Sequence, residues 1–190
     1  MSSNSACQDE PRDELINGQI VMMSPRPSNS HCTVAENLFF IFRKHLQGRT
    51  CRPLADGRDV YLTKKDRFVP DFMVVCDPKK IQPKGIFGAP DLVAEVLSPS
   101  TAHRDRSYKK DVYEQAGVKE YWIVSTAEKS VEQYLLQDGR FVLANTYTQY
   151  PDYLLEDMTE KELAALVTEF KCSLYDDLLI KLADIFEYVD

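Results

Sequence analysis

This chain of 190 residues has few histidines, no C-x-x-C pair of cysteines and no long apolar run. The five cysteines are an odd number, Cys7, Cys32, Cys51, Cys76 and Cys172, and no two of them form a C-x-x-C pair. The three histidines are scattered along the chain. These absences argue against a disulfide framework and against a structural zinc site, so we expect a reducing, cytoplasmic location.

No apolar run approaches the roughly 18 residues that a membrane-spanning helix needs, so no membrane partner is expected. The segment from Met1 to Arg12 is polar and lacks the basic start and apolar centre of a secretory signal. We expect residues 1–12 to be disordered. With 44% hydrophobic and 28% charged residues, the rest has the composition of one globular domain, residues 13–190.

The net charge of −7 at first argues against a nucleic-acid partner. The excess acidity lies in residues 152–190, which hold eleven acidic and three basic residues, whereas residues 1–151 are nearly balanced. Local basic groups occur at Lys64, Lys65 and Arg67, at Lys79, Lys80 and Lys84, and at Arg104, Arg106, Lys109 and Lys110. They fit phosphate contacts and ordinary solvated faces equally well.

Apolar periodicity and turn signals predict strands and helices that follow one another along the chain. The predicted strands are a hairpin over 14–23 with its turn at Asn17-Gly18, then 58–63, 68–76, 91–97, 120–125, 130–136 and 140–146. The predicted helices run from a cap at Ser28 or Ser30 to Leu46, and over 101–116, 159–170 and 178–188, with a loop over 77–89. This order implies an α/β fold, a mixed sheet flanked by helices.

Two of the apolar strands each contain one lone carboxylate. Asp71 lies in Phe68–Val75, and Glu95 lies in Leu92–Leu97. An ionised carboxylate in a buried strand is costly unless it is paired or binds a metal, and two close together repel unless a cation neutralises them. Hard oxygen ligands suit Mg²⁺ or Mn²⁺. Taken singly, each also fits a strand-end residue that faces solvent or pairs with a lysine or arginine.

The helix after Glu95 carries Asp105, Lys109 and Tyr113 at a spacing of four, which places them on one face. Because this helix starts just after the carboxyl end of the Glu95 strand, its first turns can lie over the carboxylates. A lysine there would orient a water nucleophile or stabilise charge on a phosphate. The other interpretation is an ordinary Asp–Lys pair on the helix surface.

These residues together resemble the PD-(D/E)XK nuclease superfamily, and more closely the Uma-two family of restriction endonucleases. The matching segments are Glu14–Val21, Val69–Asp71, Pro90–Thr101, Asp105, Lys109, Tyr113, Gly117-Val118, Glu120–Val124 and Leu182–Phe186. The match is specific from Asp91 to Val124. The acidic segment from Pro151 to Ser173 fits the family least. The resemblance implies a restriction-endonuclease-like domain.

The resemblance also implies roles for single residues. Asp71 would be the superfamily aspartate and Glu95 the glutamate, 24 positions later. The superfamily expects a lysine two residues after the glutamate, where this chain has Leu97, so the lysine role moves to Lys109. A further glutamate on the first helix often completes such sites, and Glu36 is the candidate, although it also fits a solvated helix residue.

The function predicted in this way is metal-dependent hydrolysis of DNA phosphodiester bonds. Asp71 and Glu95, with Glu36, would hold Mg²⁺ or Mn²⁺, Lys109 would position water or offset charge, and Asp105 would orient Lys109. A homodimer fits this function, because many restriction-type enzymes cut two strands with two subunits. Two other interpretations stay open: a nuclease-like domain that binds nucleic acid or protein without cutting, which Leu97 and the net charge favour, and a phosphoester hydrolase for small molecules.

Overall fold

The computed structural model describes residues 12–23 and 26–189. Most of the N-terminal segment that was predicted to be disordered lies outside these residues. Among the residues described, no helix is long and apolar enough to cross a membrane.

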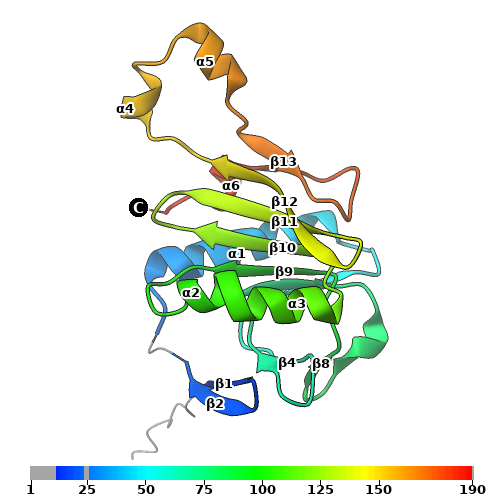
Figure 1. Ribbon diagram of the computed structural model, residues 1–190. Coiled ribbons are helices and arrows are strands. Elements are labelled where there is room, and N and C mark those ends of the chain that lie inside the picture. The colour runs from blue at the N-terminus through cyan, green and yellow to red at the C-terminus, as the bar shows by residue number, and fades with distance from the viewer. Residues whose placement is uncertain (1–11, 24–25, 190) are drawn as a thin grey trace, which may run out of the picture.

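The centre of the molecule is a six-stranded mixed sheet (Figure 1). Its strands, in spatial order, are β12 (Arg140–Thr148), β11 (Ser130–Gln137), β10 (Glu120–Ser125), β9 (Leu92–Val96), β6 (Phe72–Val75) and β3 (Arg52–Ala55). Within this sheet, as the described residues form it, β9 and β10 pair in parallel and the other neighbours pair antiparallel. The predicted α/β class, a mixed sheet flanked by helices, is confirmed.

Both faces of the central strands are buried, and alternate residues pack into two different cores. Phe72, Val74 and Ala94 pack with α1 (Asn29–His45) and the C-terminal segment on one face. Met73 and Val93 pack on the other face with the helix that ends at Ala116. Because both faces are apolar, any charged side chain that these strands point inward needs a specific partner.

Helix α1 begins where the sequence predicts. The Ser28 hydroxyl accepts a hydrogen bond from the His31 amide at 3.2 Å, which caps the first turn. Val34, Leu38 and Phe42 recur at helical spacing and are fully buried against the sheet. The cap therefore fixes the start of α1, and with it the backbone of His31.

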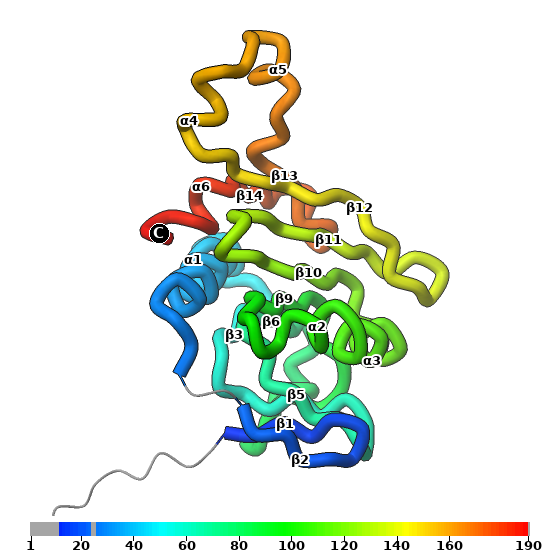
Figure 2. The backbone as a smooth tube through the Cα atoms, turned by 60° about the vertical axis from the view of Figure 1, so that its left-hand side comes forward, coloured from blue at the N-terminus to red at the C-terminus, as the bar shows by residue number. Residues whose placement is uncertain are grey.

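A second, smaller sheet of six short strands lies at the end of the molecule opposite the projecting segment described below (Figure 2). In spatial order its strands are β2 (Gln19–Met22), β1 (Asp13–Ile16), β5 (Arg67–Phe68), β4 (Val60–Tyr61), β8 (Gly85–Phe87) and β7 (Ile81–Gln82). The predicted hairpin at Asn17-Gly18 is confirmed as β1–β2. The predicted loop over 77–89 is wrong in part, since a 3₁₀ turn, η1 (Pro78–Lys80), precedes a β7–β8 hairpin there.

The helix that follows β9 is continuous but not uniform. It starts as α2 (Ala102–Arg104), widens into a π-helical turn, η2 (Asp105–Lys109), and continues as α3 (Lys110–Ala116), which Gly117 ends in the left-handed conformation. π-turns of this kind occur frequently at functional sites. Asp105 and Lys109, two predicted site residues, bound this turn and are both buried.

The C-terminal part departs most from the prediction. Thr159 caps α5 with the predicted capping box, but α5 ends at Ala165 (Glu160–Ala165), and Phe170 lies in β13 (Glu169–Lys171) instead of a helix. The final segment is β14 (Leu179–Lys181), paired with β13, followed by α6 (Leu182–Ile185). The alternation of exposed and buried residues around Phe170 and Ile180 favours strands that cover α1's core.

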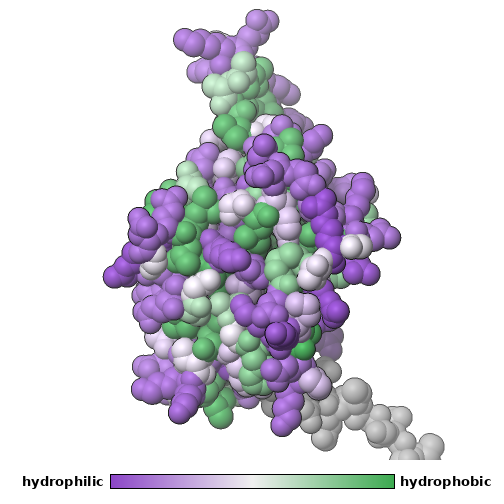
Figure 3. All heavy atoms as spheres, turned by 90° about the vertical axis from the view of Figure 1, so that its right-hand side faces the viewer, coloured by the Kyte–Doolittle hydropathy of each residue, from purple (hydrophilic) through white to green (hydrophobic). Residues whose placement is uncertain are grey.

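Between β12 and β13 the chain forms a projecting arm, residues 149–168, which contains α4 (Asp152–Leu155) and α5. The arm stands clear of both sheets, and its tip is hydrophilic in Figure 3. Nearly all of its residues are exposed, including the large apolar side chains of Tyr153 and Leu163. The excess acidity noted in the sequence is therefore concentrated partly on a segment that does not pack on the body.

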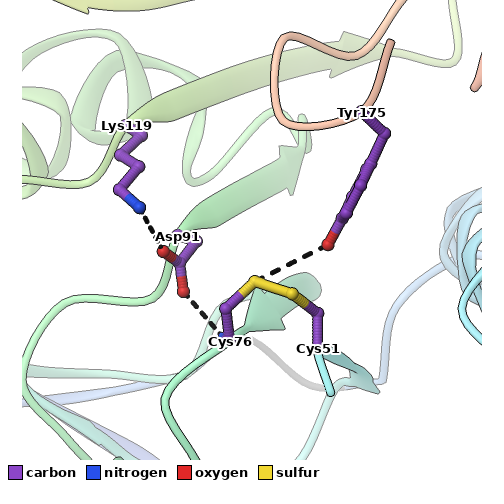
Figure 4. Close-up of a disulfide and its surroundings, with 5 residues drawn as sticks. All are labelled: Cys51, Cys76, Asp91, Lys119 and Tyr175. Atoms are coloured by element: carbon purple, nitrogen blue, oxygen red, sulfur yellow. Dashed lines mark hydrogen bonds and ion pairs between the residues drawn. A yellow bond between two sulfur atoms is a disulfide. The ribbon is translucent and has the colours of Figure 1, made fainter. Parts of the chain in front are cut away.

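One disulfide is present, although the cysteine count and spacing argued against a disulfide framework. Cys51 and Cys76 are bonded (Figure 4). The physical reason is sheet register: Arg52 pairs with Val75 across β3 and β6, so the two flanking cysteines face each other. The amide of Cys76 also donates to Asp91 at 2.7 Å, and Lys119 pairs with the same carboxylate at 2.8 Å. Asp91, directly before β9, thus braces the end of β6.

Candidate active site

Asp71 and Glu95 are opposite each other in the sheet. Phe72 pairs with Ala94 at the end of the antiparallel register of β6 and β9, and continuing that register by one residue sets Asp71 against Glu95. Directly opposite residues point to the same face, with Cβ atoms about 4.5–5.5 Å apart. One oxygen of Asp71, Oδ2, accepts the Val96 amide at 2.7 Å, which fixes this carboxylate against β9. The two carboxylates predicted from the sequence are therefore brought together.

Lys109 is the cation that compensates Glu95. Its Nζ lies 3.1 Å from Glu95 Oε1, 2.8 Å from Glu14 Oε1 and 3.7 Å from Asp105 Oδ1. Only 3% of Lys109 is exposed. The ammonium of Lys109, on the helix, therefore reaches the Glu95 carboxylate on the strand. The position two residues after Glu95, where the superfamily pattern has its lysine, is occupied by Leu97.

Glu14 is a site residue that the sequence argument missed. It lies in β1, is 3% exposed, and its Oε1 also accepts the Val69 amide at 2.9 Å. A glutamate in a short hairpin strand normally faces solvent, and nothing local distinguishes this one. The available signal was that Glu14 opens the first segment that resembles the family.

The buried charges perturb one another strongly. Burial raises the pKa of Glu95 well above its ordinary value, and the nearby Lys109 offsets only part of this effect. Burial lowers the pKa of Lys109, but the carboxylates of Glu95, Glu14 and Asp105 outweigh it, so the net shift is upward. Lys109 therefore remains an ammonium ion at neutral pH.

Asp105 lies in the π-turn and is 1% exposed. Burial raises its pKa, although the charge of Lys109 and a hydrogen bond with Thr101 act in the opposite direction. Its Oδ1 accepts no hydrogen bond from the described residues, and its backbone carbonyl accepts one from Tyr121 at 3.0 Å. The orphaned oxygen is a buried acceptor, and buried acceptors in native proteins normally have a partner.

Two further groups hold the carboxylates from either side. The Tyr113 hydroxyl donates to Glu95 Oε1 at 2.8 Å, and burial raises the pKa of this phenol well above its usual value. On the other side, His31 Nε2 lies 2.9 Å from Asp71 Oδ1. Burial lowers the pKa of His31, but the hydrogen bond and charge of Asp71 outweigh burial and raise it.

One open cleft of about 1030 Å³ is lined by the charged groups of the site: Glu14, His31, Asp71, Glu95, Asp105 and Lys109. The cleft is bounded by the β1–β2 hairpin, the start of α1, the ends of β6 and β9, and the loop and first turns of the helix after β9. Its walls also carry three arginines, Arg12, Arg26 and Arg104. The floor of the cleft is thus acidic, with cationic side chains around it.

Comparison with known proteins identifies the family. A family model described as "Uma2: Putative restriction endonuclease" matches residues 4–168. The chain belongs to the Uma2 family. The predicted resemblance is therefore confirmed, and the family description together with the shared fold supports a nuclease.

Two proteins similar to this Uma2 chain extend the comparison. An uncharacterized protein from Synechocystis is 29% identical over 137 residues, which cover 70% of this chain and 72% of that protein. A crystal structure of a putative nuclease belonging to DUF820 from Anabaena variabilis superposes with a TM-score of 0.68 at 20% identity, covering 94% of this chain and 92% of the other. At that identity the structural likeness shows the shared fold.

Glu36 does not join the other predicted residues of this Uma2 site. It is exposed on α1 and is absent from the cleft wall that the described residues form. The apolar face of α1, with Val34 and Leu38, packs on the sheet and leaves Glu36 on the solvent side. The carboxylate that joins those of Asp71, Glu95 and Asp105 in the cleft is instead that of Glu14, in the β1–β2 hairpin.

The donor set of this Uma2 site fits a divalent cation. Within residues 12–23 and 26–189, no three His, Cys, Asp or Glu side chains form a ready-made cage. Mg²⁺ nevertheless needs only one or two protein carboxylates, because it keeps several waters. Four carboxylates, Glu14, Asp71, Glu95 and Asp105, surround one lysine and one histidine, and the orphaned Asp105 oxygen adds an unmet acceptor. A cation with hard-oxygen preference would relieve that excess negative charge.

Proposed function

We propose that this protein is a metal-dependent endonuclease that hydrolyses phosphodiester bonds of DNA. The observation that carries the proposal is the cross-strand pair of Asp71 and Glu95, with the Lys109 ammonium on Glu95, at the floor of an open cleft. Family membership and fold support the nuclease class.

Asp71 and Glu95 would hold Mg²⁺ or Mn²⁺ from neighbouring strands. The bound ion would supply Lewis-acid polarisation of a phosphate oxygen and a bound water of lowered pKa. The protein's own contribution is to hold Asp71 in place through the Val96 amide and Glu95 through Tyr113 and Lys109. Such fixed positions cost no reorganisation when the substrate arrives.

Lys109 acts as a fixed positive charge. Because its pKa is raised by the surrounding carboxylates, it cannot serve as a general base at neutral pH. It can donate a hydrogen bond to a water or stabilise negative charge as it develops on the phosphate. Glu14 and Asp105 hold the ammonium on either side and so set its direction.

The arginines on the cleft wall would contact the phosphates of the substrate strand. Arg104 is about one-third exposed, and its guanidinium is as far as 4.0 Å from Glu14 Oε2. This contact is long, so the side chain can turn to an incoming phosphate. Arg12 is paired with Asp56 and partly exposed. Such contacts position a nucleic acid without reading its sequence.

The direct test is cleavage of supercoiled plasmid and of single-stranded DNA with Mg²⁺, with Mn²⁺ and with EDTA. Wild type should cleave with a divalent cation only, and Asp71→Asn should lower the rate by at least about 100-fold, as loss of a central electrostatic group does. Glu36→Gln is the matched control, since Glu36 is an exposed carboxylate of α1, and it should keep wild-type activity. Cleavage in EDTA, or full activity of Asp71→Asn, would overturn the proposal.

A second candidate is a nuclease-like domain that binds nucleic acid or a protein without cutting. Leu97 at the usual lysine position, and the engagement of Lys109 by three carboxylates, favour it. This candidate predicts that DNA is retained in a binding assay while every cation tested leaves it intact. Two further proposals follow only if cutting is observed: action as a homodimer, which sedimentation would measure, and discrimination of DNA from small phosphoesters, which competition would measure.

A further inference from the structure

The two oxygens of the Asp71 carboxylate have different partners. Its Oδ2 is held by the Val96 amide at 2.7 Å, inside the end of the sheet. Its Oδ1 meets His31 Nε2 at 2.9 Å. Any cation that binds Asp71 through Oδ1 must therefore come to rest next to the imidazole nitrogen.

The separation of these two atoms suits simultaneous ligation. Neighbouring donors around an octahedral ion with bonds of roughly 2.1 Å lie about 3.0 Å apart. His31 Nε2 and Asp71 Oδ1 are 2.9 Å apart, so both can bind one ion without moving relative to each other. A neutral imidazole offers one lone pair, and Nε2 supplies it when the ring proton is on Nδ1.

Both side chains are fixed and reachable from the cleft. The His31 backbone is held by the Ser28 cap at the start of α1, and both residues line the cleft. The side chains are 15% and 14% exposed, which leaves them partly open to solvent ions. This contact joins the start of α1 to the carboxylate at the end of β6.

We propose that His31 is a ligand of the divalent cation, through Nε2, beside Asp71. The proposal rests on the metal site of the proposed function and adds the class of ion that this site prefers. An imidazole nitrogen raises affinity for first-row transition metals much more than for Mg²⁺. The site should therefore bind Mn²⁺ and Co²⁺ more tightly than Mg²⁺.

The other role for His31 is to orient Asp71 through a hydrogen bond alone. His31→Asn separates the two roles, because an asparagine amide can donate a hydrogen bond but offers no ligating nitrogen. His103→Asn is the matched control, since His103 is exposed on α2 and lies outside the cleft lining formed by the described residues.

The experiment loads the full chain with Mn²⁺ alone and records pulsed electron paramagnetic resonance for nitrogen coupling to the manganese. Wild type and His103→Asn should show histidine nitrogen modulation, and His31→Asn should lose it. Titration should also show Mn²⁺ affinity falling about tenfold or more in His31→Asn, with a smaller change for Mg²⁺. Circular dichroism checks that each variant is folded.

Manganese bound without nitrogen coupling, coupling that survives in His31→Asn, or absence of Mn²⁺ binding would each overturn the His31 assignment. The nuclease proposal is judged separately by plasmid cleavage. Cleavage that depends on Asp71 but is accompanied by no nitrogen coupling would leave the nuclease standing and remove His31 from the ligand set. Nitrogen coupling that His31→Asn removes, in a protein that cleaves no DNA, would support His31 as a ligand and contradict the nuclease proposal.

Discussion

At the scale of single residues, the site is governed by one buried ammonium among three carboxylates. Glu14, Glu95 and Asp105 come from the first hairpin, the central sheet and the π-turn, so Lys109 joins three elements. Removing one partner of a buried ion pair leaves an uncompensated charge, which costs more than the pair itself contributes. The same group that would serve catalysis therefore also stabilises the fold.

Lys109→Met should lower the free energy of unfolding by about 3–5 kcal/mol, because three buried carboxylates lose their cation. Adding Glu14→Gln should recover part of that loss, since one of the uncompensated charges is then neutral. Urea denaturation of the two single variants and the double variant measures this coupling.

Lys110→Met is the control for this pair of variants. Lys110 is adjacent in sequence and lies over the Tyr134 ring at 4.1 Å, and its loss should cost about 1 kcal/mol or less. Strictly additive effects of Lys109→Met and Glu14→Gln would show that the ion pair does not hold the hairpin to the helix.

At the scale of elements, the register of strand pairing decides which side chains lie opposite each other. The antiparallel register of β6 with β9 brings Asp71 opposite Glu95, and that of β3 with β6 brings Cys51 opposite Cys76. Strand β6 therefore carries a site carboxylate before its first residue and a disulfide after its last.

The disulfide closes a loop with a sequence separation of 25 residues. By the chain-entropy relation, such a loop adds about 3.5 kcal/mol to the free energy of unfolding. Cys51→Ser should show that loss in urea denaturation under oxidising conditions, and dithiothreitol should destabilise wild type but not the variant. Cys32→Ser, the control at a free cysteine, should respond to dithiothreitol as wild type does. Equal stability of wild type with and without reductant would contradict a stabilising disulfide.

Local patterns predicted most of the elements but not their partners. The Asn17-Gly18 hairpin, the Ser28 cap and the Gly117 helix end follow from short-range signals, and the structure has all three. Strand β3 was missed because Pro53 argues against a strand, and proline is tolerated there because β3 is an edge strand. Without β3, the pairing of Cys51 with Cys76 could not be foreseen.

The sequence predicted some residues of the candidate site and missed others. Asp71, Glu95, Asp105 and Lys109 stood out because charges in apolar strands and at helical spacing need an explanation. Glu14 could not be found by that argument, since it reaches Lys109 only through the pairing of a remote hairpin with β5. Glu36 was placed by analogy, and the packing of α1 turns it to solvent.

At the scale of the whole molecule, charge is unevenly placed. The segment Asp152–Val167 of the arm holds five acidic residues and one basic residue, and it projects from the body (Figure 1). Long-range repulsion between this segment and a polyanion would slow association without touching the cleft.

Replacing residues 152–167 by a short glycine-serine linker changes the net charge from −7 to −3. The shortened protein should keep its melting temperature within a few degrees, because the arm's side chains are almost all exposed. It should bind DNA more tightly at low salt, with the difference shrinking as salt rises. Unchanged affinity at every salt concentration would show that the arm does not affect nucleic-acid binding.

The central claim is that the Asp71–Glu95 pair is the metal-dependent catalytic centre. The most direct measurement is the single-turnover rate of supercoiled plasmid cleavage with Mn²⁺ for wild type, Glu95→Gln and Glu36→Gln, each checked for folding. The account predicts that Glu95→Gln loses at least about 100-fold in rate while Glu36→Gln matches wild type. Equal rates for Glu95→Gln and wild type would contradict it.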